Sequence, residues 1–252
     1  MNVKDKVVLI TGGGKGIGFG IATAFAKEGA KLAITGRTIS TLQGAKQELE
    51  EKYGAEVLML PGDGGDEAVV NGIVKQVVEH YGKLDVLINN AQASKSGTML
   101  VDHTKEDLDL AIYSGIYATF FYMKAAFPYL KEAQGSVINF ASSAGFSGKP
   151  GQASYAAAKE GVRGLSRVAA TEWGEWNINV NVVAPLVMTE QLHAWSEKYP
   201  EVYAQTIKNI PMGRFGDAER DIGRLCIFLA SEDGKYISGD TISVQGGTGL
   251  RP

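Results

Sequence analysis

The stretch Val7-Val-Leu-Ile-Thr11-Gly-Gly-Gly-Lys15-Gly-Ile-Gly18 decides the fold class of this chain. Its first five residues are β-branched or aliphatic and predict a buried strand, and a glycine-rich turn then leads into an amphipathic helix. Glycines in such a turn let the backbone approach a pyrophosphate, which meets the amides of the helix N-terminus. The residues predicted to hold a phosphorylated nucleotide here are Gly12, Lys15, Gly16, Ile17 and Gly18.

The same alternation of strand and helix continues along the chain. Short apolar runs predict strands at Val7–Thr11, Lys31–Thr35, Val57–Leu60, Leu84–Ile88, Ser136–Phe140, Asn177–Val183 and Thr241–Val244. Amphipathic stretches predict helices over 16–29, 38–53, 66–81, 104–131, 153–174 and 217–230. This order is typical of an α/β fold, and we predict one doubly wound parallel sheet of about seven strands with helices on both faces. Residues 1–252 would form a single domain, with 186–215 as a small substrate lid that interrupts the alternation.

Composition excludes several classes of function. The chain has 252 residues, 44% of them hydrophobic, and a net charge of −3, so no basic surface for nucleic acid is expected. No apolar run approaches the roughly 20 residues of a membrane helix. The first strand begins so early that no signal peptide is expected, and the lone Cys226 cannot form a disulfide within the chain. A cytoplasmic protein without nucleic-acid or membrane partners is predicted.

Tyr155 and Lys159 stand four residues apart in Ser154-Tyr155-Ala-Ala-Ala-Lys159, and Ser142 lies thirteen residues upstream. On a helix this spacing places the phenol and the ammonium on one face. A lysine cation stabilises the phenolate and would lower the pKa of Tyr155, making the phenol a better proton donor and acceptor near neutral pH. Beside a nucleotide-binding turn, the three residues predict a catalytic group for hydride transfer.

The end of the second strand predicts which cofactor is bound. An acidic residue there would accept hydrogen bonds from a ribose 2′-hydroxyl, but the sequence reads Thr35-Gly36-Arg37. Arg37 can pair with a 2′-phosphate, and Lys15 adds a second positive charge, so NADP(H) is predicted. Asp63, after the third strand, could accept from an adenine amino group, and Asn90 should line the cofactor cleft.

At this point the chain resembles the short-chain dehydrogenase/reductase family over essentially its full length, which implies a Rossmann-like fold. The matching segments, in chain order, are Thr11-Gly12…Gly16-x-Gly18, Asn89-Asn90-Ala91, Ser142…Tyr155-x-x-x-Lys159, Ile210-Pro-Met-Gly-Arg-Phe-Gly216 and Ile237-Ser-Gly-Asp-Thr-Ile-Ser-Val-Gln-Gly-Gly247. The resemblance implies that Tyr155 is the acid/base, that Ser142 orients the substrate oxygen and that Lys159 holds the nicotinamide ribose. It also implies adenosine contacts from Asp63, Gly64 and Asn90, a nicotinamide contact from the Met188 backbone, and a homotetramer.

Three positions depart from the family pattern. Gln92 stands in place of the glycine of Asn-Asn-Ala-Gly, and Leu186 in place of the glycine after Pro185. Gly115 aligns with the asparagine that is the fourth catalytic residue of the family. That asparagine is thought to help hold a relay water through its main chain, and Gly115 keeps a carbonyl there.

These departures, taken together, resemble a narrower group. Asn89-Asn-Ala-Gln-Ala-Ser94, Ile112-Tyr-Ser-Gly-Ile-Tyr-Ala-Thr-Phe120, Pro185-Leu-Val-Met-Thr189, Arg163-Gly-Leu-Ser-Arg-Val-Ala-Ala-Thr-Glu-Trp173 and the terminal Gly249-Leu-Arg-Pro252 are similar to segments of bacterial NADP-dependent 12α-hydroxysteroid dehydrogenases. That likeness implies interconversion of a 12α-hydroxyl and a 12-ketone on bile acids.

The lobe carries residues suited to a flat apolar substrate. If it is helical, Trp195, Tyr199 and Tyr203 would share one face, although Pro200 interrupts the second turn. Packing against the core or against another subunit explains these aromatics equally well. Gln92 and Trp195 are predicted to contact substrate together with Ser142 and Tyr155.

Two alternative functions remain open, and no catalytic metal is predicted. A 3-oxoacyl-thioester (β-ketoacyl carrier protein) reductase would share Tyr155-Ala-Ala-Ala-Lys159 and Pro211-Met-Gly-Arg214. A noncatalytic NADPH-binding regulator would account for Gly115. The three histidines do not cluster with carboxylates at the spacing of metal ligands.

Overall fold

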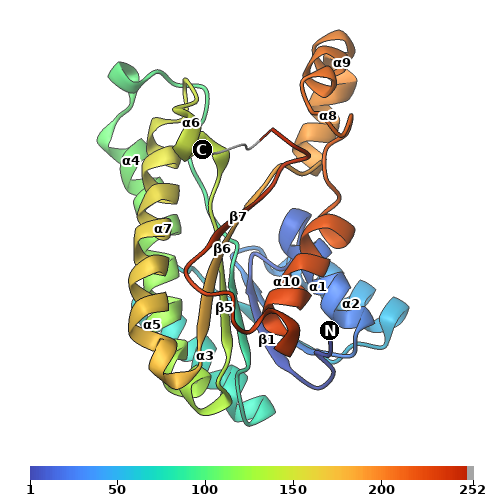
Figure 1. Cartoon of the computed structure of the whole chain (residues 1–252), viewed down its shortest axis with the longest axis vertical. Helices are drawn as coiled ribbons and strands as arrows, with labels where there is room; N and C mark the ends of the chain where they lie inside the picture. Colours follow the sequence, from blue (N-terminus) through green and yellow to red (C-terminus); the bar gives the residue numbers. More distant parts are fainter. Residues whose placement is uncertain (249–252) are drawn as a thin grey trace.

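Seven parallel strands form one sheet in the order β3-β2-β1-β4-β5-β6-β7 (Figure 1). Its strands are β1 (Val7–Thr11), β2 (Lys31–Gly36), β3 (Val57–Pro61), β4 (Val86–Asn89), β5 (Ser136–Phe140), β6 (Asn179–Pro185) and β7 (Thr241–Val244). The computed structural model describes residues 1–248, so the predicted match at Gly249–Pro252 lies outside the described residues. The predicted doubly wound parallel sheet is confirmed, and its chain order reverses between β1 and β4. Ligands of such sheets bind beyond the strand ends at this reversal.

Helices cover both faces of the sheet (Figure 1). α1 (Gly16–Lys27), α2 (Ile39–Tyr53) and α10 (Arg224–Ala230) lie on one face, whereas α3 (Glu67–Tyr81), α5 (Ala118–Ala133) and α7 (Ala153–Trp173) lie on the other. Successive residues of a strand point to opposite faces, so Val8 and Ile10 join the first core while Val7 and Leu9 join the second. Burial on both faces explains why these strands read as continuous apolar runs.

The predicted continuous helix over 104–131 is wrong. The chain forms α4 (Lys105–Ala111), a wide π-helical turn η2 (Ile112–Tyr117) and then α5. The Ser114 hydroxyl donates to the Leu110 carbonyl at 2.6 Å and to the Ala93 carbonyl at 2.8 Å, and it accepts from the Ala93 amide at 3.0 Å. Such bulges hold one extra residue in a turn and barely change the apolar spacing, so periodicity does not reveal them. The predicted helix over 217–230 likewise begins with a π-helical turn, η4 (Ala218–Gly223).

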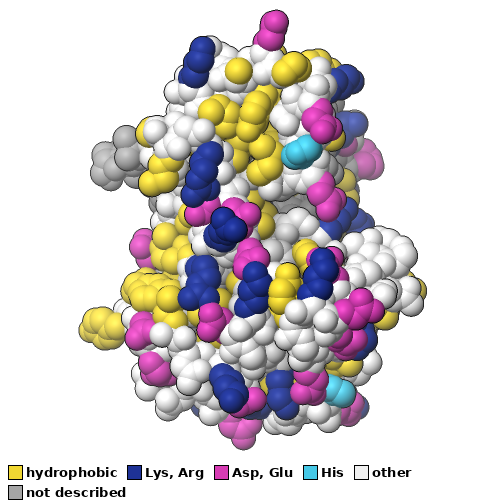
Figure 2. Space-filling view, turned by 90° about the vertical axis from the view of Figure 1, so that its right-hand side faces the viewer, with side chains coloured by type: hydrophobic (Ala, Val, Ile, Leu, Met, Phe, Trp, Pro, Cys, Tyr) yellow, Lys and Arg dark blue, Asp and Glu magenta, His cyan; other side chains and the backbone are white. Residues whose placement is uncertain are grey.

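The segment predicted as a lid carries two short helices, α8 (Glu190–Lys198) and α9 (Pro200–Lys208). Thr189 begins α8 by accepting a hydrogen bond from the Leu192 amide at 3.2 Å. Pro200 occupies the first turn of α9, where its missing amide hydrogen costs nothing, and so separates the two helices. α8 and α9 rise beyond the carboxyl ends of the strands (Figure 1). In Figure 2 hydrophobic side chains gather at this end of the molecule, while opposite charges are interspersed below.

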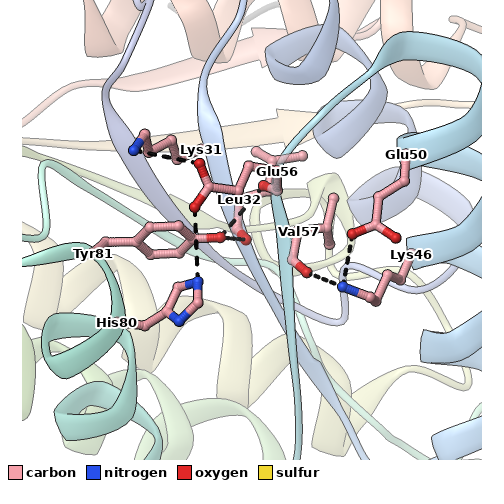
Figure 3. Close-up of polar contacts among 8 residues, drawn as sticks. All are labelled: Lys31, Leu32, Lys46, Glu50, Glu56, Val57, His80 and Tyr81. Carbon is pink, nitrogen blue, oxygen red and sulfur yellow. Dashed lines mark hydrogen bonds and ion pairs between the residues drawn. The ribbon is translucent and has the colours of Figure 1, made fainter.

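Polar side chains tie α2 and α3 to the edge of the sheet (Figure 3). The Tyr81 hydroxyl donates to the Leu32 carbonyl at 2.9 Å, and burial raises the pKa of that phenol. The Lys46 ammonium donates to the Val57 carbonyl at 2.5 Å and to the Glu50 carboxylate at 2.7 Å. These bonds fix β2 and β3, whose far ends form part of the site described next.

None of the helices between residues 1 and 248 is long and apolar enough to span a bilayer. The longest, α7, has 21 residues but carries Lys159, Glu160, Arg163, Arg167 and Glu172.

Candidate active site

The glycine-rich turn is built from the end of β1 and the start of α1. Gly12 adopts a φ of +67°, a left-handed conformation that disfavours any side chain. A Cβ on Gly18 would lie 2.2 Å from the Gly12 carbonyl oxygen, so only glycine allows the helix to approach the turn this closely. Gly18 therefore lies beneath the turn, whereas Gly12, Lys15, Gly16 and Ile17 line a cleft above it.

Hydrogen bonds join this turn to the end of β4. The Thr11 hydroxyl oxygen accepts from the amides of Asn90 and Ala91, both at 3.0 Å. The Asn90 side-chain amide donates to the Thr11 carbonyl at 3.0 Å. Deeper in the sheet, the Asn89 side-chain amide donates to the Asn139 side-chain oxygen at 2.8 Å. The carboxyl ends of β1, β4 and β5 are therefore held in one fixed arrangement.

A cleft of about 470 Å³ opens at this edge of the sheet. The predicted cofactor residues that line it are Gly12, Lys15, Gly16, Ile17, Arg37, Asp63, Gly64 and Asn90. Gln92 lines it as well. Further lining residues that the sequence did not single out include Thr38, Thr41, Ser114, Tyr122, Thr189 and Glu190. The cleft thus crosses the reversal point, from the end of β3 to the loop after β4.

Two positive side chains line this cleft near the ends of β1 and β2. Lys15 and Arg37 are both exposed. Neither takes part in the ion pairs found among residues 1–248. Asp63 turns one carboxylate oxygen toward the Gly65 amide at 2.9 Å, which shapes the loop after β3. The charge at this end of the cleft suits an anionic ligand.

Ser142, Tyr155 and Lys159 form a second cluster, at the end of β5 and the start of α7. The Lys159 ammonium nitrogen lies 5.6 Å from the centre of the Tyr155 ring and donates to the Phe140 carbonyl at 2.8 Å. Ser142 caps the short helix α6 (Ser143–Ser147) and hydrogen-bonds Tyr155. The structure thus brings the three predicted catalytic side chains together, and the Phe140 carbonyl, which no sequence motif indicates, orients the lysine.

Burial dominates the electrostatics of this cluster. It lowers the pKa of Lys159 to about 7, because the folded chain desolvates the ammonium. Burial also raises the pKa of Tyr155, and the hydrogen bond with Ser142 partly offsets this rise. Lys159 is not among the groups that shift the pKa of Tyr155 in this structure; the net shift is upward, and Ser142 only opposes the larger effect of burial. The ammonium nitrogen is directed at the Phe140 carbonyl, not at the phenol oxygen.

The remaining predicted site residues lie around the start of α8. Met188 lines a second, open pocket of about 340 Å³ together with Thr189, Glu190, His193, Ala194 and Glu197. Its amide donates to the Gly216 carbonyl at 3.0 Å, so that group is already bonded within the chain. Among residues 1–248, no group of three histidine, cysteine, aspartate or glutamate side chains could hold a metal ion.

Trp195 contacts both other lobe aromatics, although the three do not share a single helix: α8 ends at Lys198 and α9 begins at Pro200. The ring centres of Trp195 and Tyr199 are 6.4 Å apart, and those of Trp195 and Tyr203 are 6.5 Å apart. Tyr203 also stacks on Phe215 at 6.1 Å. Trp195 is half-buried, so α8 and α9 are held together by these rings and anchored to the chain that follows them.

A dinucleotide-sized cleft at the reversal point of a parallel sheet, beside a Ser–Tyr–Lys cluster, defines the class of this protein as an NAD(P)-linked oxidoreductase. Comparison with known sequences agrees. A family model described as enoyl-(acyl carrier protein) reductase matches residues 12–249. A 12alpha-hydroxysteroid dehydrogenase of a Clostridium species is 59% identical over 98% of each chain. A 3-oxoacyl-(acyl-carrier-protein) reductase of Thermotoga maritima is 35% identical over 98% of this chain and 99% of that relative.

The solved structures place the chain in the same group. The crystal structure of levodione reductase superposes with a TM-score of 0.92 and 32% identity, over 98% of this chain and 99% of that one. The chain belongs to the short-chain dehydrogenase/reductase family.

Proposed function

We propose that this chain is an NADP(H)-dependent oxidoreductase that interconverts the 12α-hydroxyl and the 12-ketone of bile acids. The observation that carries the proposal is the 59% identity to the Clostridium 12alpha-hydroxysteroid dehydrogenase, which covers 98% of both chains. The alternative, reduction of 3-oxoacyl thioesters, is supported by relatives at 35% identity.

The residues of the larger cleft fit a dinucleotide. Gly18 lets α1 pack closely against the turn, since a Cβ there would lie 2.2 Å from the Gly12 carbonyl oxygen, and the turn opens onto α1, whose amides suit a pyrophosphate. Asp63, Gly64 and Asn90 would contact the adenosine. Arg37 and Lys15 carry free positive charge where a 2′-phosphate would lie, which favours NADP(H) over NAD(H). When bound, the nicotinamide supplies or accepts the hydride.

The chain's own part in catalysis is to hold and move one proton. In ketone reduction Tyr155 would donate its phenolic proton to the carbonyl oxygen, and in alcohol oxidation its phenolate would take the hydroxyl proton. Ser142 would hold the same oxygen by a hydrogen bond. Lys159 would bind the nicotinamide ribose and, when protonated, stabilise the phenolate. Met188 would contact the nicotinamide through its carbonyl oxygen.

The substrate would lie between the Ser142–Tyr155 pair and the lobe formed by residues 186–215. We propose that residues 1–252 form one domain, so that the lobe and the sheet belong together. Trp195 does not line the open pocket of Met188 and His193, but it offers a large apolar surface on the same helix as His193, packed against Tyr199. Apolar polycyclic ligands with few polar groups suit such a surface, and Gln92 supplies a polar group at the cleft wall.

We also propose a homotetramer that pairs through the α4–α5 and α7 faces. Tyr113, Tyr117 and Phe120 are exposed there, and the first two rings stack at 5.1 Å. A contiguous exposed aromatic surface of this kind marks an interaction site. Sedimentation or light scattering gives the mass directly, and a monomer at micromolar concentration would contradict this part of the proposal.

The test of the function compares two ketones with the purified protein. A 12-oxo bile acid and an acetoacetyl thioester are each supplied with NADPH, and the loss of NADPH absorbance is followed. Faster turnover of the bile acid, with no turnover of its 3-oxo and 7-oxo isomers, is expected. Preference for the thioester would support the reductase alternative. Binding of NADPH without turnover of any ketone would support a noncatalytic regulator.

A further inference from the structure

Gln92 and Gly115 share one space beside the reactive cluster. A Cβ on Gly115 would lie 3.0 Å from the side-chain carbonyl carbon of Gln92 and 3.1 Å from its amide nitrogen. The same Cβ would lie 3.3 Å from the Cβ of Ala158. The carboxamide of Gln92 therefore fills the room that a side chain at position 115 would need, and only one of the two positions can carry a large side chain.

The Gln92 carboxamide has no partner within the described part of the chain. Its oxygen and its nitrogen are both buried, and neither makes a hydrogen bond to residues 1–248. A buried polar group without a partner costs free energy, so native structures satisfy such groups with water or a ligand. Gln92 also lines the larger cleft. Its carboxamide, with two donors and one acceptor oxygen, is thus available to a hydrogen-bonding molecule at the cleft wall.

The fold brings this carboxamide to the helix that carries the reactive pair. Ala158 lies in α7 directly before Lys159 and in the turn that follows Tyr155. Ser114 fixes the other side, because its hydroxyl bonds to the amide and the carbonyl of Ala93, next to Gln92. The π-helical turn η2 thus holds the loop after β4 against α7, and bulges of this type recur at functional sites.

Lys159 has donors to spare for a proton pathway toward Gln92. An ammonium has three hydrogen-bond donors, and the protein acceptor for Lys159 is the Phe140 carbonyl at 2.8 Å. Each ketone reduction removes one proton from the site, because Tyr155 gives its proton to the product oxygen, and that proton must be replaced from solvent. A buried lysine needs a chain of hydrogen bonds to exchange with solvent.

We propose that Gln92 is a positioning residue for this proton exchange: its carboxamide, in the space that Gly115 leaves free, orients the water through which Lys159 and Tyr155 recover their proton. The inference rests on the proposed function, since it concerns the same reaction. In this inference the absence of a side chain at Gly115 leaves space for the Gln92 side chain, and Gln92 supplies the polar group that binds the water.

The kinetic test uses Gln92→Met, which keeps the length of the side chain and removes its hydrogen bonds. We expect kcat for ketone reduction to fall about tenfold or more, the cost of one lost hydrogen bond in the transition state. The pH dependence of kcat should also shift relative to the parent protein. KM for the ketone should stay within about twofold of the parent value. Gln47→Met, on α2 and bonded to Glu51, is the matched control and should match the parent protein.

Two kinetic outcomes would overturn the proposal. A Gln92→Met protein with the parent kcat and pH profile would show that the side chain only packs. A change confined to KM would show that Gln92 binds substrate and leaves proton transfer alone. If the parent protein turns over no 12-oxo bile acid, the proposed function fails, and the profile is then measured with any secondary alcohol that the protein oxidises.

The shared space is tested without substrate or cofactor. Gly115→Asn in the parent background should lower the melting temperature by about 2–4 °C, the shift that ~1 kcal/mol produces in a domain of this size. In the Gln92→Gly background the same substitution should have no effect or raise the melting temperature, because the space is open. Equal shifts in both backgrounds would overturn the inference that the two residues compensate for each other.

Discussion

The Lys159 ammonium nitrogen lies 5.6 Å from the centre of the Tyr155 ring, yet its hydrogen bond goes to the Phe140 carbonyl at 2.8 Å. The strand end therefore fixes the lysine from below, while the helix holds the phenol one turn away. This arrangement leaves the phenol oxygen to Ser142 and keeps the lysine desolvated, with a pKa of about 7.

The buried lysine makes stability depend on pH. The pKa of Lys159 is about 7 in the folded chain and about 10.5 for an exposed lysine, so between these values the unfolded chain binds the proton that the folded chain lacks. The free energy of unfolding should therefore rise with pH across this window. Below the window Lys159 is protonated in both states, and the full cost of burying its charge is present. The substitution Lys159→Met removes the titrating ammonium and, with it, this pH dependence of stability.

Melting curves of both proteins at about pH 6.5 and about pH 9.5 check this, since a change of ~1 kcal/mol shifts the melting temperature by about 2–4 °C. Between the lower and the higher pH, the melting temperature of the parent protein should rise by at least that much relative to that of Lys159→Met. The raised pKa of Tyr155 acts in the opposite direction only above its ordinary value of 10. A difference that is constant with pH would show that Lys159 titrates normally.

Tyr155→Phe should lower kcat about 10²–10⁴-fold, the usual contribution of a positioned acid or base. Binding of NADPH, followed by fluorescence, should stay within about twofold, because the ring still packs in place. Tyr236→Phe is the control, since Tyr236 is fully exposed. Retention of activity in Tyr155→Phe would remove the phenol from the mechanism.

Arg37→Ala should weaken NADPH binding far more than NADH binding. A charge-assisted hydrogen bond contributes about 1.5–3 kcal/mol, which predicts roughly ten- to a hundredfold for NADPH. Titration calorimetry with each coenzyme measures the two dissociation constants. Arg224→Ala, which breaks only the ion pair with Glu28, should change neither. Equal losses for both coenzymes would show that Arg37 does not meet a 2′-phosphate.

Gly18→Ala should destabilise the protein and abolish coenzyme binding, because its Cβ would lie 2.2 Å from the Gly12 carbonyl oxygen. Gly44→Ala is the matched substitution on α2, where a Cβ meets nothing within 4 Å. It should stabilise the chain by about 0.5–1 kcal/mol, the usual gain of alanine over glycine inside a helix. Chemical denaturation of both variants tests the pair, and a stable, coenzyme-binding Gly18→Ala would contradict the close approach.

The sequence alone predicted the sheet, the glycine-rich turn after β1 and the grouping of Ser142 with Tyr155 and Lys159. Strand runs such as Val7–Thr11 and Ser136–Phe140 match the structure because burial on both faces leaves a continuous apolar signal. Tyr155 and Lys159 were found because their contact is local, one turn apart on a helix. Such features follow from short stretches of chain, and periodicity and spacing report them faithfully.

Only the tertiary structure decided the features that depend on distant segments. The turn η2 is held by the hydrogen bond of Ser114 to Ala93, which lies 21 residues earlier in the chain, in the loop after β4. The low pKa of Lys159 comes from burial by the surrounding fold, and the contact of Gln92 with Gly115 joins a loop to a helix bulge. Desolvation and shared volume are properties of the packed molecule, so no local pattern encodes them.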